Sequence, residues 1–165
     1  EISTNSESAR LEGFEQIMAP ALDVTNAICG YEFLWPLKYY YRRDPSSISK
    51  NIADRLADWE QITTEQYAVL LDERNAMRAA HDALSDEFSA FITLSATGPA
   101  PEGHDWTGDP IYAVNSSILG APAINLPLLE AEGMPLGIQL IGYPRKDREL
   151  FAYARWILDV LGLPR

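Results

Sequence analysis

Two groups of side chains in this sequence have types and spacings that hydrolytic chemistry could use. Ser47 and Lys50 form a Ser-x-x-Lys pattern, which places a hydroxyl and an amine one helical turn apart. Ser116 and Ser117 form an adjacent serine pair. Ser47 follows a proline at the start of a helical pattern, where serines are ordinary caps, and the serine pair lies inside an apolar helix without flanking glycines. We therefore expect neither pair to be catalytic, although a compact standalone enzyme that uses Ser47 and Lys50 stays an open alternative.

The thiol and imidazole groups of the chain do not form a recognisable site. Cys29 is the single cysteine, so an intrachain disulfide is excluded, and no basic neighbour in the sequence would activate its thiol. His81 and His104 lie too far apart in the sequence for the paired spacing of a zinc site. The sequence predicts no metal and no cofactor.

Composition narrows the class of protein. The 165 residues match the length of one domain, and 47% of them are hydrophobic. The net charge of −11 argues against a nucleic-acid partner, because phosphate binding needs clustered basic residues. No apolar run approaches the roughly 20 residues that span a bilayer, and residues 1–7 do not have the pattern of a signal peptide. We expect a cytoplasmic protein that binds neither membrane nor nucleic acid.

The first half of the sequence has helical periodicity. Residues 7–41 predict a helix that breaks at Pro20, with further interruptions at Gly30 and Pro36. A second helix is expected over 48–59. Thr63 and Gln66 have the spacing of a capping box, which predicts the start of a long amphipathic helix that continues to about Phe88.

The second half is rich in glycine and proline and has short apolar runs. The patterns predict a strand over 91–94, a loop over 98–108, a helix over 111–119 and two strands over 123–129 and 136–142. A turn over 130–135 joins the last two strands as a hairpin. Asp147 is expected to cap a closing helix that ends at Gly162.

The strand content indicates an incomplete sheet. Two of the three strand candidates are apolar at nearly every position, which is typical of strands buried on both faces. Three short strands with these helices do not make a complete sheet. We therefore expect further strands of the same sheet to lie in residues outside this chain.

Residues 107–142 contain an ordered series of glycine and proline positions that is similar to a motif of a known protein family. Thr107-Gly108-Asp109-Pro110, then Asn115, then the runs 119–127 (LGAPAINLP) and 133–142 (GMPLGIQLIG) resemble the C-terminal block of the amidase-signature family. Upstream, 91–95 with 98–101 resembles the family's strand and following loop, except that Leu94-Ser95 stands where the family usually has Thr-Pro. The strong resemblance covers residues 88–160.

The resemblance implies the C-terminal part of the amidase-signature fold, an α/β/α mixed-sheet architecture. All of 1–165 is then one segment of an amidase domain, with a helical region (1–88) followed by a strand-hairpin-helix block (89–165). The family hydrolyses amide C–N bonds with a Ser–cis-Ser–Lys triad and an oxyanion hole of backbone amides. Those groups precede the matched block, and this chain has neither the Gly- and Ser-rich segment nor the lysine strand. We expect this chain alone to be inactive.

The same resemblance gives candidate substrate contacts: Asp109, Tyr112 and Ser116, with Trp106 as a wall. The alternative for Asp109-Pro110 is that it only caps a helix, and Gln139 is expected to bond backbone rather than substrate. The expected partners are a small-molecule amide and the rest of an amidase chain or a partner subunit, and an exposed sheet edge would allow homo-oligomers. The alternative function is a non-catalytic remnant or interaction module of the same fold.

Overall fold

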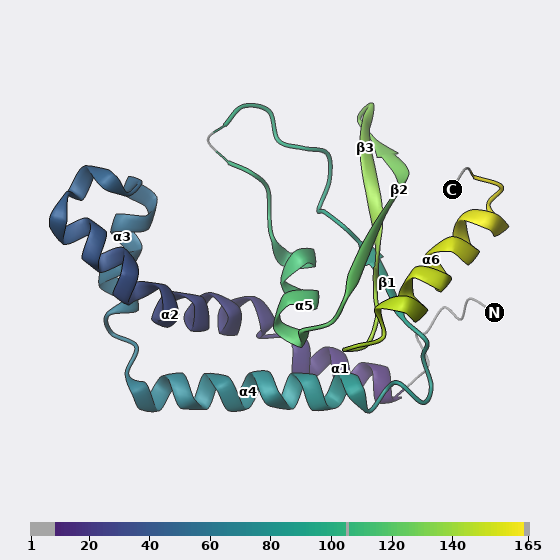
Figure 1. The fold of residues 1–165 in the computed structure, drawn as a ribbon, viewed down its shortest axis with the longest axis horizontal. Helices are drawn as coiled ribbons and strands as arrows, with labels where there is room; N and C mark the ends of the chain where they lie inside the picture. Colours follow the sequence, from purple (N-terminus) through teal and green to yellow (C-terminus); the bar gives the residue numbers. More distant parts are fainter. Residues whose placement is uncertain (1–8, 105, 164–165) are drawn as a thin grey trace. The chain divides into compact units, whose positions relative to one another are not determined.

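The computed structural model describes residues 9–104 and 106–163, which form two compact units (Figure 1). Unit 1 comprises residues 9–18 and 77–163, and unit 2 comprises residues 19–76. Helix α4 (Thr64–Asp82) contributes to both, because the division falls after Ala76.

Unit 1 is built on a three-stranded antiparallel sheet. Its strands are β1 (Phe91–Leu94), β2 (Ala123–Ala131) and β3 (Met134–Ile141), in the order β1-β3-β2. The register pairs Ile92 and Ile124 with Leu140 from opposite sides. The predicted strands and hairpin are confirmed, with the hairpin strands longer than expected.

The hairpin turn is tighter than the predicted 130–135 segment. Only Glu132 and Gly133 separate β2 from β3, and both have positive φ, 55° and 76°. Two consecutive left-handed residues are what a two-residue hairpin turn of matching twist requires. Pro127 lies where the register shifts between Leu126 and Leu129, as expected for a residue that cannot donate to the ladder.

Helices cover both faces of the sheet (Figure 1). On one face, α6 (Asp147–Val160) packs Leu150 and Ala154 against Leu126 and Leu140 to form the core. On the other face lies α5 (Ile111–Leu119), because Gln139 points away from that core and bonds to α5. The helix–sheet–helix arrangement confirms the predicted α/β class.

The edge strand β1 is incompletely covered. Ile92 and Leu94 pair with Leu140 and Ile138, so they point to the α6 face of the sheet. Ile92 is nevertheless 50% exposed and Leu94 36% exposed. Aliphatic side chains on a sheet face are normally covered by other elements, because their burial is stabilising. Ile92 and Leu94 are not covered in this way, so they form an open apolar surface beside α6.

Two predicted boundaries in unit 1 are wrong. Helix α4 ends at Asp82 rather than near Phe88, and a series of turns follows. Arg10 of α1 (Ala9–Met18) stabilises these turns because its guanidinium bonds the Ala83 carbonyl and pairs with the Asp86 carboxylate. Asp147 is the first residue of α6 and not its cap, so it acts through the helix dipole instead.

In unit 2, helix α2 (Ala21–Arg43) is followed by η1 (Pro45–Ser47) and α3 (Lys50–Trp59). The break predicted at Pro20 is confirmed, because α1 ends before it. The interruptions predicted at Gly30 and Pro36 are wrong, because α2 continues through both. The Trp59 ring occupies the space of a Cβ at Gly30, so the glycine serves close helix packing and not a break.

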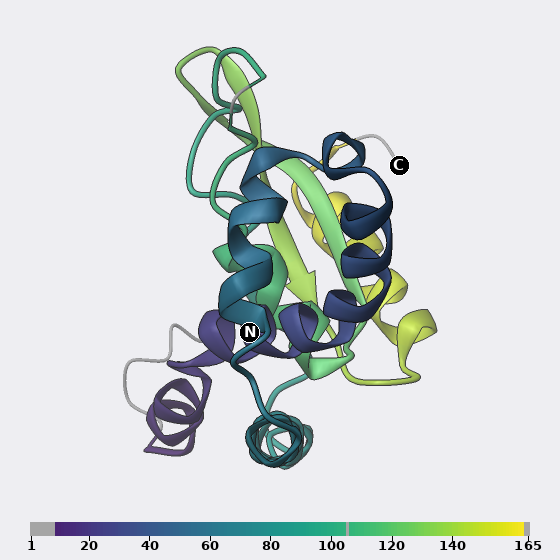
Figure 2. The same ribbon diagram turned by 90° about the vertical axis from the view of Figure 1, so that its left-hand side faces the viewer.

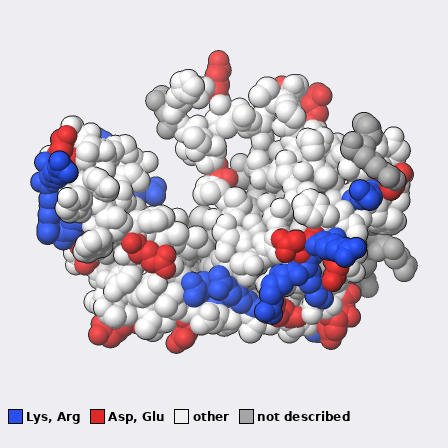
Figure 3. All heavy atoms as spheres, viewed as in Figure 1, with Lys and Arg blue, Asp and Glu red and all other residues white. Residues whose placement is uncertain are grey.

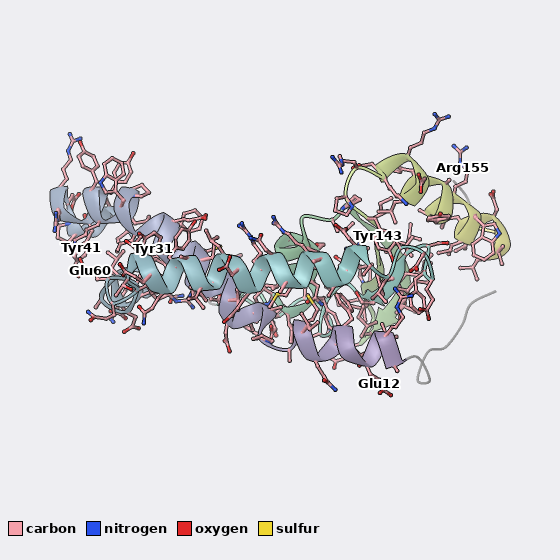
Figure 4. The ribbon with its side chains drawn as sticks, turned by 90° about the horizontal axis from the view of Figure 1, so that it is seen from below. Glu12, Tyr31, Tyr41, Glu60, Tyr143 and Arg155 are labelled. Atoms are coloured by element: carbon pink, nitrogen blue, oxygen red, sulfur yellow. The ribbon has the colours of Figure 1, made fainter. Side chains whose placement is uncertain are left out.

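The capping box at the start of α4 is confirmed. The Thr63 N–H donates to Oε1 of Gln66 at 2.8 Å, and the Gln66 N–H donates to Oγ1 of Thr63 at 3.2 Å. One turn later, Tyr67 stacks on Tyr31, labelled in Figure 4, with ring centroids 4.2 Å apart.

Candidate functional site

A cavity of about 440 Å³ lies in unit 1 between the segment after β1 and the β2–β3 hairpin. Figure 2 shows this segment beside the hairpin at one end of the sheet. We call the cavity the loop pocket. Its described lining consists of Ser95, Ala96, Thr97, Gly98, Pro99, Ala100, Pro101, Trp106, Thr107, Gly108, Asp109, Asn125, Pro127, Pro135, Leu136 and Gly137.

The floor of the loop pocket is formed by the sheet. The backbone N–H and the hydroxyl of Ser95 both donate to the Gly137 carbonyl at 3.0 Å, so the chain leaving β1 is held against β3. The Asn125 side chain reaches over Gly137 from β2. A Cβ at Gly137 would collide with the Asn125 amide oxygen and lie 2.8 Å from the Ser95 hydroxyl. Glycine is therefore required here for these two polar groups to share the floor.

Asp109 is both a wall of the loop pocket and a side-chain acceptor at the start of α5. Its Oδ1 accepts a hydrogen bond from the Ile111 N–H at 3.0 Å, while the N-cap position itself is Pro110, which makes no side-chain cap bond. Asp109 thus caps the first N–H of α5 from one position further out than the Asp-Pro pair predicts. The cap and a ligand contact are compatible, because a carboxylate has a second oxygen.

The four predicted site residues separate into two groups. Trp106, 61% exposed, and Asp109 line the loop pocket. Tyr112 and Ser116 lie further along α5 and are not among its described lining residues. The Tyr112 carbonyl accepts from Nε2 of Gln139, and the Ser116 hydroxyl donates to the Ala113 carbonyl at 3.3 Å.

Asn125 and Ser95 are polar pocket residues that the sequence reasoning did not identify. A signal for Asn125 exists, because it is a lone polar residue among apolar neighbours in β2. Its importance depends on Gly137 of the next strand, which lies two residues before Gln139, the partner of Asn125 in the hairpin register.

The electrostatic environment of the loop pocket is acidic. Asp109 carries the one charged side chain among the described lining residues. The sequence contains no lysine or arginine between Arg78 and Arg145. On the face shown in Figure 3, the described atoms at the loop and hairpin end are white and red, and the blue atoms lie elsewhere. This environment opposes the binding of anions.

The other candidate nucleophiles have structural partners. In unit 2 the Ser47 hydroxyl donates to the Tyr40 carbonyl at 3.2 Å, while the Lys50 ammonium pairs with Asp54. Ser49, between them, caps α3. The Ser117 hydroxyl donates to the Ala113 carbonyl at 3.0 Å. Burial raises the pKa of the Cys29 thiol, with a smaller contribution from Glu32, so the reactive thiolate is disfavoured.

His81 belongs to the core of unit 1. It is fully buried, and its ring stacks on Tyr143, labelled in Figure 4, with centroids 4.6 Å apart. Burial lowers the pKa of His81, partly opposed by Asp82, and burial raises the pKa of Tyr143 to about 12. Both side chains are therefore neutral at pH 7 and pack as aromatic core residues.

The described part of the chain offers neither a metal cluster nor a membrane-spanning helix. Residues 9–104 and 106–163 contain no group of three or more His, Cys, Asp or Glu side chains that could hold a metal ion. None of their helices is both long enough and apolar enough to cross a bilayer.

Known proteins resemble this chain over part of their length. No family model matches. The glutamyl-tRNA(Gln) amidotransferase A subunit of Clostridium botulinum (strain Eklund 17B / Type B) is 34% identical over 96 residues, which are 53% of this chain and 20% of that protein. Its counterpart from Borreliella burgdorferi is 41% identical over 54 residues, 32% of this chain and 11% of that protein. The chain thus spans about a fifth or less of these curated relatives.

Solved structures show the same fold. An amidase superposes with a TM-score of 0.74 at 22% identity, over 83% of this chain and 34% of its own. A bacterial aryl acylamidase of the amidase-signature family superposes with a TM-score of 0.59 at 16% identity, over 84% of this chain and 32% of its own. These likenesses, with the sequence relatives, confirm the resemblance to the amidase-signature family. The chain is similar in sequence to part of these relatives and has the fold of the matching part of the solved structures.

Proposed function

We propose that this chain is the C-terminal part of an amidase that hydrolyses the carboxamide C–N bond of a small molecule. The observation that carries the proposal is the loop pocket, built from the segment that matches the family motif and set on the matching fold. In this role the chain supplies a substrate-binding wall. Trp106 and Asp109 contact the substrate directly, while Tyr112 and Ser116 support the same region from α5.

The Ser–cis-Ser–Lys triad lies outside this chain in the proposed enzyme. Within the described residues, each serine considered as a nucleophile bonds a backbone carbonyl, and Lys50 pairs with Asp54. A nucleophilic serine needs a base within hydrogen-bond reach, so this arrangement favours a triad on other polypeptide. The open apolar surface at Ile92 and Leu94 is where further polypeptide would bury side chains of β1.

The partners of the chain are thus a small-molecule amide and either the remaining amidase polypeptide or a separate subunit. The alternative of a non-catalytic interaction module draws on unit 2. Helix α2 exposes large aromatic side chains, of which Trp35 is 81% exposed, and exposed aromatic groups are enriched at protein interfaces.

Ammonia release from benzamide tests the proposal. The assay uses the chain purified together with its proposed partner, the remaining amidase polypeptide or the separate subunit. The kcat/KM of this assembly is compared with that of the same assembly carrying Trp106→Ala. Loss of the indole wall lowers kcat/KM about tenfold or more, as expected for a large aromatic contact. Glu130→Gln, an exposed change outside the described pocket lining, is the control. An assembly with no amidase activity, or full activity in Trp106→Ala, would contradict the proposal.

A further inference from the structure

The polar groups of the loop pocket point to a particular ligand chemistry. Asn125 is exposed within the pocket, and its carboxamide has no hydrogen-bond partner among the residues that the structure describes. The amide therefore retains a free N–H donor and a free carbonyl acceptor in one plane. Such a pair is complementary to the carbonyl and N–H of another amide or of a urea.

The floor of the pocket has room for the Asn125 carboxamide. Gly137 leaves room for the Asn125 amide, and the Ser95 hydroxyl already donates its hydrogen bond to the Gly137 carbonyl. Asn125 is consequently the floor residue whose side-chain donor and acceptor are both available to a ligand. It lies on a strand of the hairpin, which holds a side chain more rigidly than a loop does.

The charge of the pocket disfavours a carboxylate, the group closest in shape to a primary amide. A carboxylate has the shape of a primary amide but presents two acceptor oxygens. One of these would face the Asn125 carbonyl oxygen, and the same pocket holds the Asp109 carboxylate with no cationic side chain among its described lining residues. Unpaired acceptors and like charges both oppose binding, so the arrangement discriminates against the anion.

We propose that Asn125 is a specificity-determining residue that makes the loop pocket select a neutral, planar amide or urea group over a carboxylate. Asn125 donates to the carbonyl oxygen of this group and accepts from its N–H. Trp106 and Asp109 line the same pocket, and the Asp109 carboxylate repels carboxylates. The inference rests on the proposed function in that it names the substrate class for the same site, but it concerns binding and not bond cleavage.

Isothermal titration with matched probes tests the inference. Benzamide and benzoate share their ring and shape and differ in charge and in N–H donors. The full chain, with the polypeptide that holds it, binds benzamide at least about tenfold tighter than benzoate. Asn125→Asp keeps the side-chain shape and removes the donor, and it lowers benzamide affinity about tenfold. Asn75→Asp makes the same chemical change at an exposed position of α4 and leaves the affinity unchanged.

The structure of the complex supplies a second readout. In the wild-type protein, benzamide shifts the NMR signals of the Asn125 side-chain amide and the Trp106 indole N–H, whether or not the variant folds well. Asp109→Asn keeps a capping oxygen for α5 and reduces the ratio of benzamide affinity to benzoate affinity. The inference is overturned if benzamide does not bind, if benzoate binds as tightly, or if Asn125→Asp matches Asn75→Asp.

Failure of this inference is distinguishable from failure of the proposed function. Selective binding of benzamide without ammonia release would refute the amidase while the binding inference stands. Ammonia release with equal benzamide and benzoate affinity, and an unchanged KM in Asn125→Asp, would refute the inference while the amidase stands.

Discussion

Gln139 donates its side-chain amide to the carbonyl oxygen of Tyr112 at 3.0 Å and so joins the middle strand of the sheet to helix α5. Gln139 is only 8% exposed, and it stands in a strand that is otherwise largely apolar. The bond fixes the first turn of α5 over the sheet. Asp109, which caps that turn, is thereby held at the wall of the loop pocket.

Replacement of Gln139 by leucine lowers the free energy of unfolding by about 1–2 kcal/mol, because a buried hydrogen bond to the Tyr112 carbonyl is lost. Gln61→Leu is the matched control, since Gln61 makes the same type of bond to the Ala57 carbonyl at an exposed site, at 3.4 Å. Urea unfolding of both variants is the measurement. Gln61→Leu loses less, and a Gln139→Leu variant as stable as wild type would contradict a stabilising role for the Gln139–Tyr112 bond.

Gly120 ends α5 with a φ of 62°, and a Cβ there would also lie 3.4 Å from the Arg78 guanidinium. Gly120→Ala therefore costs about 1–2 kcal/mol of stability, because a side chain disfavours the left-handed region. Gly98→Ala is the control, since Gly98 does not have that backbone conformation and a Cβ there meets nothing within 4 Å. Thermal unfolding compares the two, and a Gly120→Ala variant as stable as wild type contradicts the assigned geometry.

Acid pH destabilises unit 1 through His81. Burial holds the pKa of the folded-state imidazole below its ordinary value of 6.5, so the unfolded chain takes up the proton first as the pH falls. The loss of stability begins near pH 6.5 and is complete below the folded-state pKa. Asp82 opposes the shift, but burial is the larger cause.

The variant His81→Phe isolates this contribution, because phenylalanine fits among the rings of Phe14, Phe91 and Tyr143 without a titratable group. Urea midpoints at pH 7.5 and pH 5 are compared. The wild type loses more stability than His81→Phe over this range. A parallel loss in both proteins would place the acid sensitivity in other groups.

The cap role of Asp109 is separable from its charge. Asp109→Ala removes the acceptor for the Ile111 N–H and lowers stability by about 1 kcal/mol, whereas Asp109→Asn retains a capping oxygen and stays close to wild type. Chemical denaturation monitored by far-ultraviolet circular dichroism measures both. If the asparagine variant is as unstable as the alanine variant, Asp109 stabilises α5 by its charge alone.

Features set by neighbouring residues could be predicted from the sequence. The capping box of Thr63 and Gln66, the stop at Gly120 and the Glu132-Gly133 hairpin all depend on residues within one turn of one another. The family resemblance predicts Asp109 and Trp106 as substrate contacts, and both line the loop pocket.

Features that depend on contacts between distant residues could not be predicted from the sequence. Helix α2 continues through Gly30 because Trp59, from another helix, fills the space beside it. The turns after α4 are stabilised by Arg10, which lies 73 positions before Ala83. The floor of the loop pocket needs Ser95, Asn125 and Gly137 together, and three separate segments supply them.

Amide hydrolysis by the isolated 165-residue chain is the most direct test of the account, since the chain is proposed to supply a binding wall without the groups that break the bond. Purified chain incubated with benzamide is predicted to release ammonia no faster than buffer. Sustained release by the chain alone, abolished by Ser47→Ala or another serine replacement within it, would contradict the account.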